Sequence, residues 1–370
     1  MSVAGKISGL LDKVMRRENL TIDESADAMA VIMSGDATPA QISGLLVGLT
    51  MKGERPSEIA GLARTMRTNA VRLSKAYADV FDTCGTGGDR SGTFNISSAA
   101  ALVVAAAGVR VAKHGNRSVS SRCGSADVFE QLGIDLTAAP AVVERSLDAV
   151  GIAFFFAPTF HPSMRQAAPV RRELGVRTAF NLLGPLTNPA GAKRQLVGVP
   201  EPELTELMAR ALLLLGADRA WVVHGAGGID EMSTTGHTKV SECRDGAVST
   251  FYVHPSDFGL PKAGPADLGG GDAAANAEII LGILNGSRGA PRDVVLLNAG
   301  AGLFISGKAR SVRDGIEMAA KAIDSGAARR KLEEMAAASA GREARDVGRD
   351  ARDVGRDARD VGRDFSRAED

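Results

Sequence analysis

Residues 82–127 read DTCGTGGDRSGTFNISSAAALVVAAAGVRVAKHGNRSVSSRCGSAD, the pattern of a strand, a glycine-rich turn, a helix and a second strand. The turn spans 85–89, and the helix is expected to begin near Asn95. Glycines let a backbone approach a ligand and aim successive N–H groups at it. A helix N-terminus adds free donors and partial positive charge. Together with the cations of 113–117 and the serines that follow, the stretch predicts a pocket for a highly charged phosphorylated compound.

Downstream of this stretch, β-like runs alternate with helical stretches. The β-like runs lie near 79–84, 109–113, 152–156, 195–199, 220–224, 248–253 and 294–298. The helical stretches include 95–107, 140–149, 203–215, 272–284 and 309–324. This alternation predicts an α/β domain with a largely parallel central sheet. Ligands in such sheets bind at the carboxyl ends of the strands. We therefore expect the turns 85–89 and 113–117 and the loop 224–231 to converge.

The first 73 residues predict a small helical domain that precedes the α/β domain. Thr21 and Glu24 have the capping-box spacing at the start of a second helix. Pro39 and Pro56 stand where a third and a fourth helix would begin, a position that proline favours. Apolar residues recur at helical spacing through this region, and no strand pattern interrupts it.

Composition excludes several classes of protein. The chain has 370 residues, of which 44% are apolar, and its 44 basic residues balance its 44 acidic ones. This balance gives no global field that would attract nucleic acid or an anionic membrane. Three widely spaced cysteines argue against a disulfide framework or a zinc site. With no signal peptide and no apolar run long enough to span a membrane, we expect a cytoplasmic protein.

Two readings remain open for the polar residues around the turn. Asp89 would repel a phosphate, so it either faces sugar hydroxyls or metal-bound water, or simply caps the following helix. Asn95, Ser97 and Ser98 either cap that helix or bind phosphate, and Ser97 could also reach a metal. Lys113 and Arg117 are either ordinary surface charges or two cations of an anion site, and their position around a His-Gly-Asn turn after an apolar strand favours the anion site.

Two further groups of residues have chemical potential. Asp230 and Glu231 lie on a glycine-rich loop after a buried strand. Adjacent carboxylates of this kind suit Mg²⁺, which prefers oxygen ligands, although most Asp-Glu pairs are merely solvated. His161 and Arg171 belong to a third group, in which an arginine could bind a carboxylate and a histidine could pack on an aromatic ring. The alternative for Arg171 is a structural ion pair with Glu173 or another acid.

The ordered motifs resemble those of anthranilate phosphoribosyltransferases, a family of tryptophan biosynthesis. GTGGD, KHGNR, SAD, HPxMR, VRRELGVRT, NLLGPLTNPA and GIDE occur in the family's order over roughly residues 5–335. The resemblance implies a nucleoside phosphorylase/phosphoribosyltransferase-like fold and a homodimer. It implies a helical domain of 1–73 that takes in about 166–186, and an α/β domain of 74–165 and 187–340. The sequence departs from the family at Cys123, where serine is common, and at Ser98, where threonine is common.

The resemblance also implies roles for individual residues in a transfer from phosphoribosyl pyrophosphate to anthranilate. The substrate-binding residues would be Gly85, Gly88, Asp89, Thr93, Asn95, Ser97, Ser98, Lys113, His114, Asn116, Ser121, Ser125, His161 and Arg171. Within this set, Lys113, Asn116 and Arg171 would act in catalysis, with Arg171 on the anthranilate carboxylate. Ser97, Asp230 and Glu231 would hold Mg²⁺.

Two other functions fit some of the same residues. A pyrimidine nucleoside phosphorylase shares the architecture and a glycine-rich phosphate site, but HPxMR and NLLGPLTNPA favour the transferase. A non-enzymatic nucleic-acid-binding relative would be expected to carry a basic surface, and this chain is neutral overall.

The C-terminal tail, 341–370, differs from the rest of the chain. ARDVGRD occurs there three times in tandem, at 344–350, 351–357 and 358–364. Alanine and valine follow coiled-coil spacing, but one glycine per heptad weakens a helix by about 1 kcal/mol each. We therefore expect a disordered tail without a catalytic role.

Overall fold

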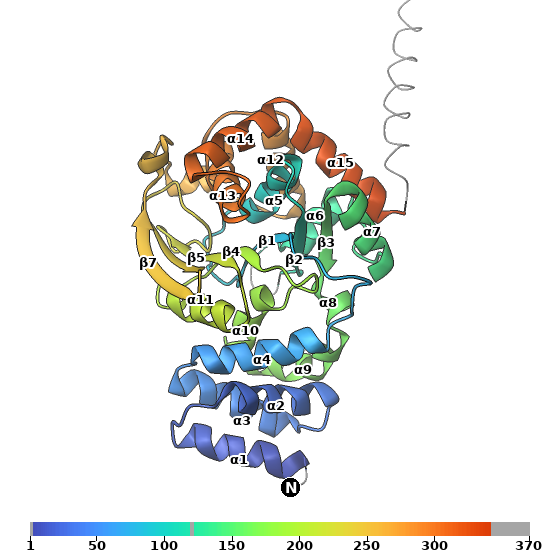
Figure 1. Cartoon of the computed structure of the whole chain (residues 1–370), viewed down its shortest axis with the longest axis vertical. Helices are drawn as coiled ribbons and strands as arrows, with labels where there is room; N and C mark the ends of the chain where they lie inside the picture. Colours follow the sequence, from blue (N-terminus) through green and yellow to red (C-terminus); the bar gives the residue numbers. More distant parts are fainter. Residues whose placement is uncertain (1–2, 119–121, 342–370) are drawn as a thin grey trace, which may run out of the picture.

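The computed structural model describes residues 3–118 and 122–341. Ser121 and the repeats of the tail lie outside these residues, so the expectations for them stay predictions. Figure 1 shows a helical part at one end of the molecule and a larger α/β part stacked on it. The predicted fold class, a small helical domain followed by a larger α/β domain, is confirmed.

The helical part begins with four helices whose ends the sequence largely specifies. They are α1 (Val3–Met15), α2 (Ile22–Ser34), α3 (Pro39–Lys52) and α4 (Pro56–Thr68). The predicted capping box at the start of α2 is confirmed: Glu24 N–H donates to Thr21 Oγ1 at 3.1 Å, and Thr21 N–H donates to Glu24 Oε2 at 2.9 Å. Prolines occupy the first turns of α3 and α4, where their missing N–H costs nothing.

A seven-stranded sheet forms the centre of the α/β part, in the order β3-β2-β1-β4-β5-β6-β7. Its strands are β1 (Phe81–Gly85), β2 (Val111–Gly115), β3 (Ile152–Phe156), β4 (Arg194–Gly198), β5 (Arg219–Gly225), β6 (Thr238–Arg244) and β7 (Ala247–Val253). The first five strands are parallel, and β6 and β7 continue the sheet as an antiparallel hairpin. The sheet is therefore largely parallel, as predicted.

Two elements differ from the expectation. The apolar run 294–298 lies inside a long buried helix, α13, because a short apolar run has the same appearance in a buried strand and a buried helix. Strand β6 was not predicted, because Lys239, Ser241 and Glu242 interrupt its apolar character.

Helices cover both faces of the sheet. The helices that follow α4 in the chain are α5 (Ile96–Ala106), α6 (Ser125–Gln131), α7 (Pro140–Val150), α8 (Ala157–Phe160), α9 (Ala168–Leu174), α10 (Ala179–Leu183), α11 (Leu204–Leu214), α12 (Ala273–Leu284), α13 (Ala290–Ile305), α14 (Val312–Asp324) and α15 (Ala327–Ser339). In Figure 1, α5 and α12–α15 lie above the sheet, and α10 and α11 lie between the sheet and the helical part.

The core follows the alternation of side chains along each strand. In β4, Leu196 joins the cluster that contains α5 and α13, whereas Val197 joins the cluster that contains α11 and α1–α4. This second cluster is continuous from the sheet into the helical part. It also includes Val170 of α9, which contacts α3, and Phe180 of α10, which contacts α3 and α4. The segment between β3 and β4 therefore packs against the N-terminal helices.

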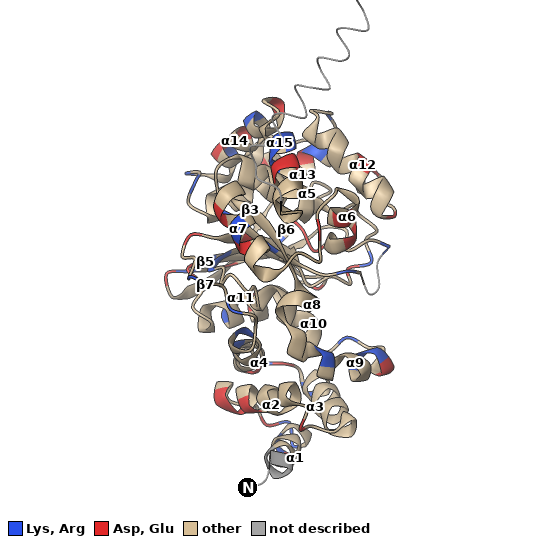
Figure 2. Ribbon diagram, turned by 90° about the vertical axis from the view of Figure 1, so that its right-hand side faces the viewer, with Lys and Arg blue, Asp and Glu red and all other residues tan. Residues whose placement is uncertain are grey.

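Charged residues of both signs are interspersed along both parts of the molecule (Figure 2). Within the residues that the structure describes, no helix has the length and apolar character needed to cross a membrane.

The α2–α4 contact depends on a residue without a side chain. A Cβ at Gly61 would overlap the Ile22 carbonyl oxygen and lie 2.7 Å from Ser25 Cβ. We expect Gly61→Ala to destabilise the protein by about 1–3 kcal/mol, because a packed interface must move apart. Differential scanning calorimetry should show a lower melting temperature.

The matched control is Gly9→Ala at an exposed position of α1, where a Cβ meets nothing within 4 Å. It should stabilise the helix by about 0.5–1 kcal/mol. If both variants melt at or above the wild-type temperature, the close packing of α2 on α4 is wrong.

Candidate functional site

A cavity of about 850 Å³ opens at the carboxyl ends of the parallel strands and reaches the helical part. The strand order changes direction at β1, which has β2 and β3 on one side and β4 and β5 on the other. Ligands of open α/β sheets bind at this kind of switch point. The turn 85–89 follows β1 directly, so it lies at the centre of the crevice.

Most of the residues expected at the site line this one cavity. Those that do are Gly85, Gly88, Asp89, Thr93, Asn95, Ser97, Lys113, His114, Asn116, Ser125, His161, Arg171, Asp230 and Glu231. Ser98 is fully buried inside α5 and does not line the cavity, because it points into the core. Ser121 lies outside the described residues.

The glycines of the turn make room for protein side chains. A Cβ at Gly85 would overlap Asp230 Oδ2, and a Cβ at Gly88 would overlap Arg177 Nη1. Gly88 also has a φ of +77°, which an L side chain rarely adopts. At both positions the space beside the Cα is therefore occupied by another segment of the chain, and the expected approach of the turn's backbone to a ligand stays a prediction.

The acidic pair is anchored from three sides. Asp230 Oδ2 accepts the Gly87 N–H at 3.0 Å, and Glu231 Oε1 accepts the Ser97 N–H at 3.1 Å. A Cβ at Gly198, the last residue of β4, would overlap the Asp230 carbonyl oxygen. The pair is thus held against the ends of β1 and β4 and the start of α5.

The environment of the pair is short of positive charge. Burial raises the pKa of both carboxyl groups, and nearby carboxylates add to the effect: Asp89 acts on Asp230, and Asp230 acts on Glu231. Glu231 is only 9% exposed. Asp230 keeps some surface toward the cavity, and burial of the rest of its side chain still raises its pKa. The alternative of an ordinary solvated acidic pair is wrong for Glu231.

These residues fit a hard divalent cation. Asp230, Glu231 and Ser97 offer oxygen atoms, and a cation would relieve the repulsion that raises the pKa of the two carboxyl groups. Within 3–118 and 122–341, no three or more His, Cys, Asp or Glu side chains gather into a metal site. Such a partial set of ligands suits Mg²⁺, which is usually held by one or two carboxylates and completed by waters and substrate phosphates.

The start of α5 is not capped by its own side chains. Asn95 occupies the N-cap position without a side-chain cap bond, and its Oδ1 accepts instead from Asn276 Nδ2 at 2.9 Å. The Ser97 N–H is satisfied by Glu231 from a distant loop. Asp89 does not cap the helix either, since its carboxylate accepts from the Ser91 hydroxyl. The capping alternative therefore fails for Asn95 and Asp89.

Lys113 is a buried cation on β2. It is 2% exposed, and among the described residues its ammonium group has no ion-pair partner within 4 Å. The alternative of an ordinary surface charge is wrong. The neighbouring backbone is fixed by fully buried Asp82, which accepts from the His114 N–H at 3.2 Å and from Asn188 Nδ2 at 2.8 Å. Asn188 also donates to the Ala112 carbonyl, so the NLLGPLTNPA motif secures the end of β2.

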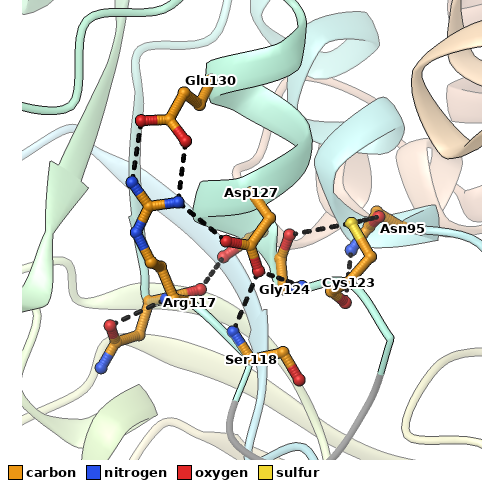
Figure 3. A network of polar contacts seen from close by, with 9 residues as sticks. Asn95, Arg117, Ser118, Cys123, Gly124, Asp127 and Glu130 are labelled. Carbon is orange, nitrogen blue, oxygen red and sulfur yellow. Dashed lines mark hydrogen bonds and ion pairs between the residues drawn. The ribbon is translucent and has the colours of Figure 1, made fainter. Parts of the chain in front are cut away.

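Figure 3 shows what holds the segment after β2. Asp127 Oδ2 accepts the backbone N–H groups of Ser118 (3.1 Å) and Gly124 (2.8 Å), so it ties the two sides of the serine-rich loop. Burial alone would raise the pKa of this carboxyl group, but these hydrogen bonds and Arg117 hold it below its usual range. The guanidinium of Arg117 pairs with Asp127 and Glu130. The expectation of Arg117 as a second free cation is therefore corrected.

The remaining wall of the cavity suits an aromatic acid. The rings of His114 and His161 lie 5.2 Å apart, and burial lowers their pKa values to about 3 and about 4, so both are neutral at pH 7. Neither ring nitrogen of His161 has a hydrogen bond of ordinary geometry within the described chain, although the Thr187 backbone is close enough to favour its charged form slightly.

The guanidinium carbon of Arg171 lies 5.3 Å from the centre of the Phe180 ring, and burial lowers the pKa of Arg171. In the part of the chain that the structure describes, Arg171 forms no ion pair with Glu173 or any other acid. The structural ion pair considered for Arg171 is therefore absent, and its guanidinium remains available at the cavity wall.

Sequence reasoning missed three residues that organise the site. Arg177 Nη1 donates to the Gly87 carbonyl at 2.8 Å, and Asn276 holds Asn95. Asn298 binds both backbone groups of Met232, the residue after the acidic pair. A lone asparagine within the apolar helix α13 was a local signal. Arg177 and Asn276 had none, because their partners are distant in sequence.

Comparisons with known proteins agree with this geometry. Residues 77–329 match the glycosyl transferase family, a/b domain, and residues 8–70 match the helical bundle domain of the same family. The fold and site thus define a two-domain glycosyltransferase. The chain is 54% identical over 327 residues to the anthranilate phosphoribosyltransferase of Moorella thermoacetica (88% of this chain, 96% of the relative). It is 53% identical over 334 residues to that of Anaeromyxobacter sp. (90% and 98%). The chain belongs to the anthranilate phosphoribosyltransferase family.

Solved structures agree as well. The anthranilate phosphoribosyltransferase from Thermus thermophilus superimposes with a TM-score of 0.85 at 45% identity, covering 89% of this chain and 98% of that one. The Saccharomyces cerevisiae enzyme in complex with PRPP and Mg gives 0.83 at 27% identity (91% and 98%). The same yeast enzyme in complex with 4-fluoroanthranilate gives 0.81 at 26% identity (91% and 98%).

We expect Asp127→Ala to destabilise the protein by about 1–3 kcal/mol, because two backbone N–H groups lose their acceptor. Glu130→Ala removes only an exposed partner of Arg117 and should cost less than about 1 kcal/mol. Urea unfolding of the two variants makes the comparison. Equal losses of stability would contradict the role of Asp127 in tying the loop.

Proposed function

We propose that this protein transfers the 5-phosphoribosyl group from phosphoribosyl pyrophosphate to the amine of anthranilate. The products are N-(5-phosphoribosyl)anthranilate and pyrophosphate, and the reaction belongs to tryptophan biosynthesis. The observation that supports this most is the convergence of the turn 85–89, the segment 113–116 and the acidic pair on one cavity.

The donor would bind on the sheet side of the cavity. The turn and the start of α5 line this side beside Lys113, which supplies a buried positive charge for the phosphates of the donor. Asp89 would face sugar hydroxyls. The donor ligands would be Gly85, Gly88, Asp89, Thr93, Asn95, Ser97, Lys113 and Ser125, together with Ser121, which lies outside the described residues.

Asp230, Glu231 and Ser97 would hold Mg²⁺. When bound, Mg²⁺ supplies charge neutralisation for the pyrophosphate that departs. Lys113 would assist, because no ion pair within the described residues uses up its charge. Donors already in place need little rearrangement as charge develops on the leaving oxygen.

The acceptor would bind against the helical side, between His161, Asn116 and Arg171. Arg171 would pair with the anthranilate carboxylate, and the two neutral histidines would pack on the ring. The amine attacks the anomeric carbon, the bond to the pyrophosphate oxygen breaks, and the nitrogen then loses a proton. An arylamine is neutral at pH 7, so the site needs chiefly to orient it.

The rival activities have less support. The relatives reported above carry the transferase name over nearly the whole chain. In the view of Figure 2, basic residues alternate with acidic ones over both parts, which does not favour a nucleic-acid surface.

Three further features belong to the proposal. The domain limits are those given by the sequence: 1–73 with about 166–186, then 74–165 with 187–340. A homodimer would form through the helical domain, where Met15 and Met51 are exposed. The cytoplasmic location stays a prediction.

Loss of anthranilate fluorescence after adding phosphoribosyl pyrophosphate and Mg²⁺ tests the donor, the acceptor and the metal together. We expect fluorescence to fall with the complete mixture and to stay constant with ribose 5-phosphate as the donor. A constant signal in the complete mixture would rule out the transferase, and phosphate-dependent cleavage of thymidine would then identify the phosphorylase.

The acidic pair has its own test. Replacing Asp230 and Glu231 together by alanine should lower turnover at limiting Mg²⁺ by about 100-fold, because charge stabilisation of the leaving group is lost. The variant should also lose Mn²⁺ binding measured by electron paramagnetic resonance. Glu201→Gln, an exposed acid on another loop, is the control and should keep both. Unchanged turnover and Mn²⁺ binding in the double variant would remove the metal role.

A further inference from the structure

The backbone of one residue of the glycine-rich turn, Gly87, is held on both sides. The Gly87 N–H donates to Asp230 Oδ2 at 3.0 Å, and the Gly87 carbonyl accepts from Arg177 Nη1 at 2.8 Å. The preceding Thr86 N–H donates to the Gly198 carbonyl at 3.0 Å. Three distant segments therefore fix the position of the turn, and Arg177 is the contribution from the segment that packs on the helical part.

The approach of Arg177 depends on the absence of a side chain at Gly88. Because a Cβ there would overlap Nη1, the guanidinium fills the space that glycine leaves open. The other terminal nitrogen, Nη2, is buried at the cavity and has no hydrogen-bond partner within the described chain. A planar guanidinium holds its two terminal nitrogens in a fixed fork, whereas the donors of an ammonium group share a single nitrogen.

The segment that carries Arg177 also carries the expected acceptor arginine. Arg171 lies in α9, and Arg177 lies in the short connection between α9 and α10. Helix α9 packs on α3, α10 packs on α3 and α4, and Phe180 of α10 lies beneath the Arg171 guanidinium. A shift of α9 and its connection would therefore move Arg171 and the Gly87 contact together.

We propose that Arg177 is a positioning residue that couples the two substrate subsites, by fixing the turn that receives the phosphorylated donor to the segment that receives the acceptor carboxylate. This inference rests on the proposed function. Arg177 acts through Gly87 and Gly88, and the consequence is that occupation of one subsite strengthens binding at the other.

The experiment compares Arg177→Gln with Arg177→Lys and with Arg172→Gln, an exposed arginine on the same segment. Steady-state kinetics should show for Arg177→Gln a lower kcat and a higher KM for phosphoribosyl pyrophosphate, with a combined loss of about 10- to 100-fold. Arg177→Lys should recover only part of it, and Arg172→Gln should stay within about twofold of wild type.

Calorimetric titration gives the readout that a merely structural role would not move. The Kd for inorganic pyrophosphate, which would occupy the donor subsite and cannot react with an amine, is measured without and with 4-fluoroanthranilate. We expect the ratio of the first value to the second to exceed one for wild type and Arg172→Gln and to fall to about one for Arg177→Gln. If Arg177→Gln does not fold, Arg177→Lys carries the test, because its ratio should lie between those of wild type and one.

Two outcomes separate the inference from the proposed function. If wild type consumes anthranilate but the Arg177 variants keep wild-type kinetics and the wild-type ratio of Kd values, the coupling role is overturned and the function stands. If wild type does not consume anthranilate, the proposed function fails first, and with it the two subsites that Arg177 would couple.

Discussion

The site depends on the burial of two adjacent carboxylates at strand ends that lack side chains. The Asp230 carboxylate lies where a Cβ of Gly85 would be, and the backbone carbonyl oxygen of Asp230 lies where a Cβ of Gly198 would be. Glu231 then reaches the first turn of α5. Because β1 and β4 are paired throughout their length, the two glycines lie side by side and leave one space in which the acidic loop packs. Any side chain at either position would push that loop away from the turn and from α5.

Packing the acidic loop in this space brings several carboxylates close together. Burial raises the pKa of Asp230 and Glu231, and repulsion from Asp89 and between the two carboxylates adds to this effect. The nearest compensation comes from groups that cannot pair with them directly: Lys113, whose charge lowers the pKa of Glu231, Arg177, whose charge lowers that of Asp230, and the start of α5. Such a site has negative charge for a divalent cation on one wall and positive charge for a polyanion on the others. A donor that brings phosphates and a dication together satisfies both walls.

The sequence predicts what is local and leaves open what is distant. The succession of strand, turn, helix and strand in 82–127 follows from hydrophobic patterning and from glycine at the turn, and the motifs name most residues of the cavity wall. The use of Gly85 and Gly88 could not be read in the same way. Their neighbours, Asp230 and Arg177, are remote in sequence, so the local pattern allows ligand approach and side-chain approach equally. Arg117 illustrates the same limit, since its pairing with α6 only becomes evident once the loop is folded back.

The two sides of the cavity differ in charge, and each suits one of the two proposed substrates. The donor side uses fixed charge and backbone donors. On the acceptor side, burial keeps His114 and His161 neutral, and Arg171 remains as a cation without an acid partner in the described chain. One fixed positive charge beside uncharged rings matches a small aromatic ligand with one carboxylate and an uncharged amine. Protonated histidines would instead attract the phosphates of the donor to the wrong wall. Under the proposed assignment, the desolvation that lowers their pKa values therefore also directs the phosphates of the donor away from these two rings.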